Sequence, residues 1–243
     1  MGKLISFVSL ILLLHIGCER EQLQTANTET IFTIDTTLEV GNVNQQQLIW
    51  NNVLQHLDLP FVGGKQLELD LDLDLINDLK FSIGFAVSPG GLNIRTVALT
   101  VLDSACTISA FEQYDSIVSY TFSYPGGTGT STANYLAGNT YPANATIQVF
   151  SNQYISTGST QQLITPTNQL WKKGSFNLYY RNATSNPVNN ANITLGNWLD
   201  GQAHYLLFKI DKNNQIKLGW IEVKLVSTSS LEIYSMGIKT LIY

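Results

Sequence analysis

The residues best suited to chemistry form a regular acidic row in LELDLDLDLIND, residues 67–78. A carboxylate occurs there at every second position: Glu68, Asp70, Asp72 and Asp74. Calcium holds carboxylate oxygens at about 2.4 Å, but alternate side chains of a strand lie about 6.6 Å apart on one face. The alternation of leucines and carboxylates predicts a strand over 66–75, with leucines facing the core and carboxylates facing water. At most two neighbouring carboxylates of such a strand could share an ion.

The spacing Asp70-x-Asp72-x-Asp74 also matches the first ligands of a helix–loop–helix calcium loop. That loop needs glycine at its sixth place and glutamate at its twelfth, where this chain has Leu75 and Phe81. We therefore expect a solvated acidic face, whose self-repulsion discourages edge-to-edge pairing with another chain. We predict no metal site and no cofactor.

Aromatic side chains are the second chemical resource. Trp171 precedes Lys-Lys-Gly, and Trp198 stands in Leu-Gly-Asn-Trp-Leu-Asp-Gly, so both surroundings are turn-like. A flat ring that a turn holds open can stack on a sugar. The candidate glycan-stacking residues are Trp171, Trp198, Tyr135 and Tyr141. The alternative is that each large ring lies in the core, where such rings are common.

No motif for enzyme chemistry occurs in the sequence. It has no G-x-S-x-G elbow, no H-E-x-x-H pair and no glycine-rich phosphate loop with a lysine. His56 and His204 stand in no recognisable nucleophile setting. Glycoside cleavage needs two carboxylates about 5–10 Å apart, and the fold sets that separation. We predict a protein that is not an enzyme, with Asp/Glu hydrolysis as the remote alternative.

The amino terminus predicts export. In MGKLISFVSLILLLHIGC, Lys3 precedes an apolar run over 4–14, followed by Gly17 and Cys18. The run is far shorter than the ~20 residues that a membrane-spanning helix needs, so it indicates a secretory signal. Its end resembles the bacterial lipobox, although His15 replaces the usual Leu, Val or Ile. The resemblance implies cleavage before Cys18 and lipidation of that residue.

Residues 19–29 are polar and predict a flexible tether. Their first residues, Glu19-Arg20-Glu21, are similar to the acidic sorting signals of Bacteroidota surface lipoproteins. Together the two resemblances imply a cell-envelope protein attached to a bacterial membrane through a lipid anchor at Cys18. They favour the outer membrane and surface exposure without excluding the inner membrane.

The charge and the cysteines narrow the class of protein. The chain has 18 acidic and 13 basic residues, a net charge of −5, and its only cationic cluster is the pair Lys172-Lys173. Nucleic-acid binding needs clustered cations, so we exclude it. If Cys18 is lipidated, Cys106 has no disulfide partner, and we expect Cys106 to be a buried, inert thiol.

Apolar and polar residues alternate along most of the chain, between clusters of Gly, Pro, Asn and Asp. This pattern predicts antiparallel strands, and we expect one β-sandwich domain over 30–243. Two segments break the pattern. Residues 44–57 show the i, i+3, i+4, i+7 spacing of a short amphipathic helix, and residues 124–144 are rich in Gly, Thr and Asn and predict a long exposed loop.

The carboxyl end carries a further resemblance. Gly219, Trp220, Ile221 and Val223 resemble the Gly-Trp-Ile-x-Val strand of a group of uncharacterised exported bacterial β-sandwich proteins. The resemblance implies a jelly-roll-like sandwich and no particular activity. We expect Trp220 to anchor the core and a β-bulge to separate it from Ile221, because the apolar face changes there.

These observations leave three functional hypotheses. The first is a lipid-anchored, non-enzymatic structural or interaction module of the envelope, with a glycan or an envelope protein as its partner. The second is a surface glycan-binding module that uses aromatic residues in loops. The third is the hydrolase.

Overall fold

The computed structural model describes residues 35–59, 63–186 and 188–242. They belong to one compact unit that begins at Ile34. All regular elements in these ranges are strands, so the all-β prediction is confirmed. Within the same ranges, no helix is long and apolar enough to span a bilayer. The predicted signal, lipidation site and tether over 1–29 lie outside the described residues.

The strands have the following bounds: β1 Leu38–Glu39, β2 Leu48–Asp58, β3 Gly63–Leu69, β4 Leu79–Val87, β5 Asn93–Val101, β6 Cys106–Tyr124, β7 Gly127–Asn134, β8 Thr146–Ile155, β9 Thr157–Gly158, β10 Leu163–Ile164, β11 Trp171–Lys172, β12 Ser175–Asn182, β13 Asn189–Leu195, β14 Ala203–Lys212, β15 Gln215–Ser227 and β16 Ser230–Thr240.

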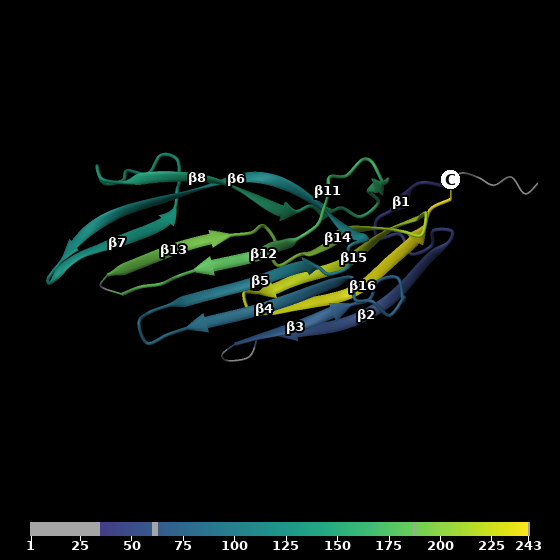
Figure 1. Ribbon diagram of the computed structural model, residues 1–243, viewed down its shortest axis with the longest axis horizontal. Helices are drawn as coiled ribbons and strands as arrows, with labels where there is room; N and C mark the ends of the chain where they lie inside the picture. The colour runs from purple at the N-terminus through teal and green to yellow at the C-terminus, as the bar shows by residue number, and fades with distance from the viewer. Residues whose placement is uncertain (1–34, 60–62, 187, 243) are drawn as a thin grey trace, which may run out of the picture. The chain divides into compact units, whose positions relative to one another are not determined.

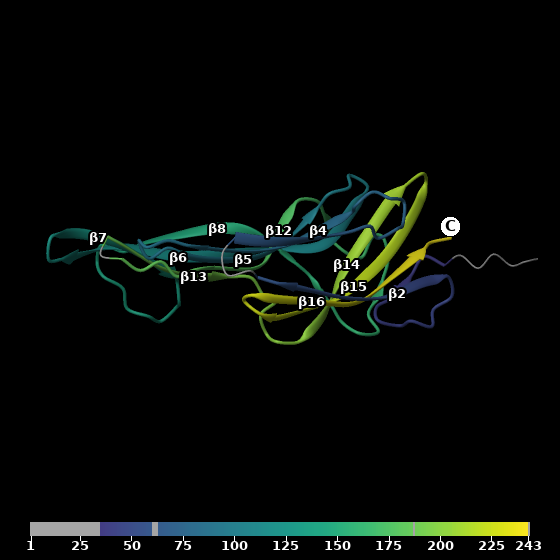
Figure 2. The ribbon, with the colours of Figure 1, turned by 90° about the horizontal axis from the view of Figure 1, so that it is seen from below.

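Fourteen strands form one sheet in the order β2-β16-β15-β14-β6-β7-β13-β12-β5-β4-β3, with β8, β9 and β11 attached to β6 and β14. Among the named strands, β7 and β13 run parallel; the other pairings are antiparallel. Figure 1 shows the strands overlapping in one view, and Figure 2 shows that the sheet folds over itself, with β16 and β2 below β4 and β12. Its end strands β2 and β3 come back into contact, which gives a nearly closed sandwich.

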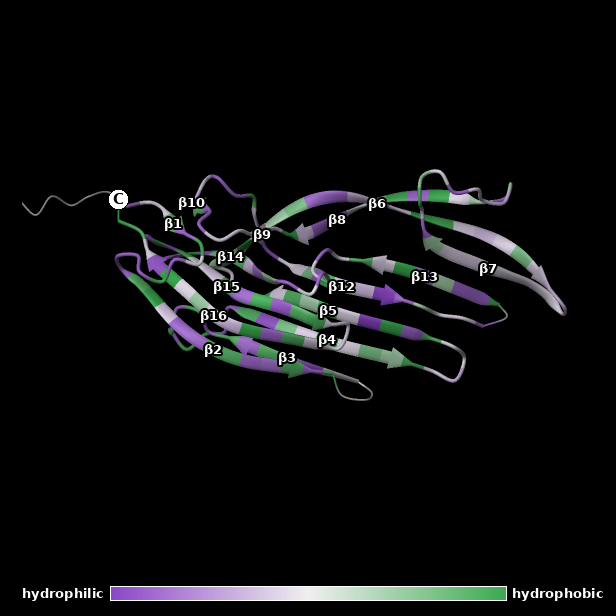
Figure 3. Ribbon diagram, turned by 180° about the vertical axis from the view of Figure 1, so that it is seen from behind, coloured by the Kyte–Doolittle hydropathy of each residue, from purple (hydrophilic) through white to green (hydrophobic). Residues whose placement is uncertain are grey.

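Hydrophobic and hydrophilic residues alternate along strands such as β5 and β16 (Figure 3). The main core lies between the two layers and includes Phe81, Leu99 and Phe208. A second, smaller cluster includes Leu38 of β1 and Ile164 of β10. The separate β1–β10 pair thus contributes to covering residues of β14 and β15 that do not belong to the main core.

Strand β15 is buried on both faces. Leu218 and Trp220 belong to the second cluster, whereas Ile221 and Val223 belong to the main core. The expected bulge between Trp220 and Ile221 is therefore wrong: adjacent residues of a regular strand point to opposite faces, and both faces are apolar here. The nearest register shift lies next to Val223, where Tyr234 is the extra residue on β16.

The predicted helix over 44–57 is wrong, because Leu48–Asp58 forms strand β2 and pairs with β16. Leu57 is buried, whereas Trp50 and Leu54 are exposed. The β2–β16 register shifts around Leu54, which has a φ of 42°. A bulge there breaks the period of two and produces an apolar spacing that imitates a helix.

The acidic row also departs from the prediction of a strand over 66–75. Strand β3 ends at Leu69, and a loop follows it. Leu71 is buried as expected, but Leu73 and Leu75 are exposed and have φ values of 61° and 72°. The side chain of Asp72 is only 4% exposed, so the division into a dry leucine face and a wet carboxylate face fails beyond β3.

The indole of Trp220 lies in the second cluster and is 1% exposed. It packs edge-on against Tyr205, with ring centroids 5.3 Å apart, and its ring lies so close to Gly237 that a Cβ there would be 2.7 Å from it. Replacing Trp220 with alanine should lower the free energy of unfolding by about 3–5 kcal/mol, measured by urea denaturation.

Trp220→Phe is the matched control. It should cost less than Trp220→Ala because it keeps a ring, and because the buried indole N–H has no hydrogen-bond partner to lose. Equal unfolding midpoints for the wild type and Trp220→Ala would remove Trp220 from its anchoring role.

A buried ion pair ties the start of the described chain to β16. Lys239 is 4% exposed, and its ammonium donates to Asp35 Oδ2 at 2.6 Å and to the Thr37 carbonyl at 2.9 Å. The hydrogen bond from Lys239 lowers the pKa of Asp35 below its ordinary value of 3.8. The ionised carboxyl is therefore stabilised in the folded state.

Asp35→Asn should lower the free energy of unfolding at pH 7 by about 1–3 kcal/mol, because a buried ammonium loses its charged partner. A lowered pKa stabilises the fold above the unfolded-state pKa and loses that effect as the pH falls through the folded-state pKa. The difference between wild type and Asp35→Asn should thus shrink below pH 3.8. A difference that does not vary with pH would contradict this assignment.

Candidate functional site

A concave site of about 740 Å³ lies where β6, β7, β13 and the chain after β7 meet. The sequence predicts a continuous loop over 124–144, but Gly127–Asn134 forms β7 and the loop begins only at Tyr135. β7 pairs with β6 on one side and with β13 on the other. Two ladders thus hold a strand in which threonines, which favour strands, alternate with Gly and Ser, which do not.

Three tyrosines bring aromatic surface to this groove. Tyr114 comes from β6, and Tyr135 and Tyr141 come from the loop after β7. The rings of Tyr135 and Tyr141 are 5.5 Å apart and inclined by 31°. Both are half-buried, whereas Tyr114 is 71% exposed. The structure therefore brings together the two tyrosines predicted from sequence and adds a third. We call this site the tyrosine groove.

The loop that carries two of these rings is held by its own hydrogen bonds. The backbone N–H of Tyr135 donates to the Ser116 carbonyl at 2.9 Å. The hydroxyl of Tyr141 accepts from the Leu136 N–H at 2.8 Å and donates to the Leu136 carbonyl at 3.3 Å. The ring positions are thus fixed before any ligand arrives, which lowers the entropic cost of binding.

Polar groups line the rest of the groove. The side-chain amide of Asn134 donates to the Thr194 carbonyl at 2.9 Å and accepts from the Thr194 N–H at 2.7 Å. This amide extends the contact between β7 and β13 past the last paired residue. Asn192 and Asn139 also line the groove, and amides present both donors and acceptors.

Asp115 is the carboxylate of the groove. Its Oδ2 accepts from the Asn152 amide at 2.6 Å and from the Tyr154 hydroxyl. Burial, followed by the hydrogen bond to Asp115, raises the pKa of Tyr154 to about 12, so this hydroxyl remains a donor at neutral pH. Asp115 and Thr194 also line a neighbouring cavity of about 210 Å³, so the two spaces adjoin.

Trp198 is not a stacking platform. Its ring is fully buried in the main core, its N–H points at the Ile155 carbonyl at 3.5 Å, and it packs edge-on against His204. The turn-like sequence around Trp198 directs the ring inward. No face of this ring is open to a ligand, so the candidate is withdrawn.

Trp171 lies in β11, outside the tyrosine groove. It is half-buried against the second cluster, and its N–H donates to the Pro166 carbonyl at 2.7 Å. The ammonium of Lys209 is 5.8 Å from the ring centroid. These contacts assign Trp171 to local packing rather than to the groove.

Sequence reasoning missed Tyr114, which lies in the middle of the long strand β6. The observed strand β6 begins at Cys106. Tyr114 stands in the alternating series Glu112, Tyr114, Ser116, but a single exposed aromatic residue is common on protein surfaces and marks no site. Asn192 begins the triplet Asn-Ile-Thr, which fits the N-glycan acceptor pattern and does not predict a ligand groove.

The remaining candidates are placed as follows. Cys106 is buried, as predicted, and burial raises the pKa of its thiol well above the usual range. His204 contacts Asp200 at 2.7 Å and His56 contacts Asp58 at 2.7 Å. The Ser230 hydroxyl lies 3.4 Å from His56 Nε2, but Asp58 contacts that same nitrogen at 2.7 Å.

No protein-family model, curated protein or solved structure matches this chain. Function must therefore be argued from the geometry and chemistry of the site.

Proposed function

We propose that this protein is a lipid-anchored module of the bacterial cell envelope that binds a glycan in the tyrosine groove. The observation that carries the proposal is the cluster of Tyr114, Tyr135 and Tyr141 in an open concave site. Sugar rings have an apolar face, formed by C–H groups, and a rim of hydroxyls. Tyrosine rings can pack against the apolar face of the sugar, and amide and hydroxyl groups can form hydrogen bonds with its hydroxyls.

The lining of the groove supports a neutral, polar ligand. Asn134, Asn139, Asn192 and Thr194 lie around the aromatic rings, and Asp115 accepts hydrogen bonds from its neighbours within the protein. The adjoining cavity behind Asp115 and Thr194 provides room for a second sugar unit. We therefore propose an oligosaccharide rather than a single monosaccharide.

The anchor rests on the sequence. The lipobox-like end at Cys18 and the polar segment 19–29 support attachment to a membrane by a lipid and a short tether. The acidic Glu19-Arg20-Glu21 supports the outer membrane and the cell surface. The resemblance of the carboxyl-terminal segment to exported bacterial sandwich proteins supports the same compartment, and the jelly-roll-like connectivity that it implies is part of this proposal.

Binding without catalysis is favoured over hydrolysis. Glycoside cleavage uses a pair of carboxylates on either side of the bond. Asp115 is the only carboxylate among the described residues that line the tyrosine groove. A purely structural module is the second candidate. Such a module needs no open aromatic rings and should bind no glycan, so a binding experiment distinguishes the two.

The groove is tested on a glycan array and by titration calorimetry, with the full chain in detergent. Tyr114→Ala and Tyr135→Ala should each weaken binding about 10-fold or more, because burying ~60 Å² of apolar surface between a tyrosine ring and the C–H face of a sugar contributes about 1.4 kcal/mol. Tyr124→Ala is the control, since Tyr124 lies outside the groove lining and its loss should leave affinity unchanged.

Three results decide the proposal for the groove. Binding that is lost in Tyr135→Ala and kept in Tyr124→Ala supports it. Absence of binding to any glycan on the array favours the structural module. Hydrolysis of a bound glycan would favour the enzyme.

The anchor is tested by metabolic labelling with a clickable fatty acid in a bacterial host. Cys18→Ala should abolish labelling and release the protein from the membrane fraction, because the thiol of Cys18 is the proposed attachment point. Cys106→Ala is the matched control and should remain labelled, since Cys106 is buried in the core. Labelling that persists in Cys18→Ala would contradict lipidation at this residue.

A further inference from the structure

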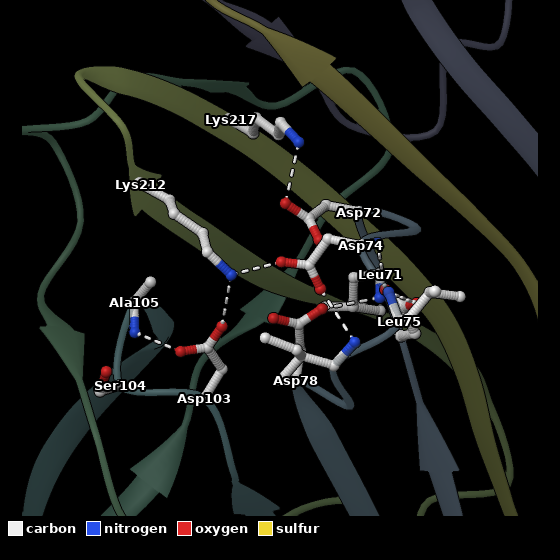
Figure 4. A network of polar contacts seen from close by, with 12 residues as sticks. Leu71, Asp72, Asp74, Leu75, Asp78, Asp103, Ser104, Ala105, Lys212 and Lys217 are labelled. Atoms are coloured by element: carbon white, nitrogen blue, oxygen red, sulfur yellow. Dashed lines mark hydrogen bonds and ion pairs between the residues drawn. The ribbon is translucent and has the colours of Figure 1, made fainter.

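The acidic row folds into a different arrangement from the one its spacing predicts. One carboxylate oxygen from each of Asp70, Asp72 and Asp78 lies within 4.8 Å of the others. Asp78 lies outside the alternating row, and the turn of residues 70–77 brings it to Asp70 and Asp72. Figure 4 shows Asp72 and Asp78 in this loop. Two oxygens on opposite sides of a calcium ion are about 4.8 Å apart, so this spacing suits one ion.

A second observation points to a missing partner. The side chain of Asp72 is 4% exposed, and its Oδ2 accepts from the Lys217 ammonium at 2.8 Å. Its Oδ1 is buried and has no hydrogen-bond partner within the described structure. Since buried polar atoms are almost always paired, and since Lys217 already holds Oδ2, Oδ1 is the atom available to a cation.

The other two carboxylates are held in place by backbone groups. Asp70 accepts N–H hydrogen bonds from Leu73 at 2.8 Å and Leu75 at 2.8 Å, while Asp78 accepts from Leu71 at 2.7 Å. An ionised carboxylate has about four lone-pair sites. Both groups therefore keep acceptor capacity for a metal while their orientation is fixed.

The local charge balance favours a cation. Two ammonium groups, those of Lys212 and Lys217, lie among five carboxylates. These carboxylates belong to Asp70, Asp72, Asp74, Asp78 and Asp103. The protein thus holds more negative charge here than its own lysines neutralise.

We propose that Asp70, Asp72 and Asp78 bind one calcium ion. The ligand atoms are oxygens only, which excludes a preference for soft metals. Calcium is favoured over magnesium because it accepts irregular coordination and carboxylates at longer distances, whereas magnesium requires a near-ideal octahedron. The ion would close the 70–78 loop and neutralise the charge that Asp72 carries into the interior.

The sequence-based rejection of a metal considered a straight strand and a helix–loop–helix loop. The straight strand over 66–75 does not include Asp78, and the loop was rejected on Leu75 and Phe81, although Asp78 stands at its ninth place. The site proposed here depends on the turn after β3, and it is independent of the tyrosine groove, so either proposal can fail without the other.

The experiment uses the full chain in detergent, stripped of metals with a chelator that is then removed. Calcium should give a one-to-one binding heat in titration calorimetry and a Tm that rises with calcium concentration. Magnesium should give a smaller rise. Asp72→Asn should abolish both responses, because it removes the charge of the buried ligand.

Asp74→Asn is the matched control. Asp74 lies in the same loop but pairs with Lys212 and is not one of the three ligands, so this variant should keep the calcium response. If Asp72→Asn does not fold, Asp78→Asn replaces it, and the same loss of response is expected.

Two results would overturn the proposal. One is the absence of heat and of any Tm shift at millimolar calcium in the wild type, which would mean that a proton on Asp78 rather than a metal relieves the cluster. The other is an equal loss of response in Asp74→Asn and Asp72→Asn, which would mean that calcium acts on the surface charge of the loop as a whole.

Discussion

The burial of strand β15 on both faces is the constraint on which the rest of the fold depends. Trp220 and Ile221 are neighbours in sequence but belong to different apolar clusters. A strand of this kind must be covered twice, by the opposite layer of the sandwich on one side and by the β1–β10 pair on the other. The buried Lys239–Asp35 pair then holds the first described residues against the same sheet.

From this rigid part the chain builds its candidate site with few specialised residues. Strand β6 takes part in the main core near Ile108 and reaches the tyrosine groove at Tyr114, so one continuous strand connects the two. The groove is shaped by backbone ladders and by the self-contained hydrogen bonds of Tyr141. Its rings are consequently held in position before a ligand binds, which lowers the entropic cost of binding.

The acidic loop shows how one local choice changes the chemistry of a segment. Within β3, Glu68 is exposed while its neighbour Leu69 is buried, as the sequence predicts. At Asp70 the carboxylate captures three backbone N–H groups, of Leu73, Asp74 and Leu75. The chain then turns, and a row that was spread out along a strand becomes a cluster around one point.

The sequence by itself determined the all-β class, the inward placement of Trp220 and the burial of Cys106, because period-two alternation and side-chain transfer free energy are local properties. It also marked Tyr135 and Tyr141 as candidates. The tertiary structure alone decided that 48–58 is a strand, that Trp198 faces inward, and that Tyr114 and Asp78 contribute to the two sites. The physical reason is that bulges, side-chain caps and strand pairing between distant segments set which face a residue occupies, and a one-residue shift reverses that face.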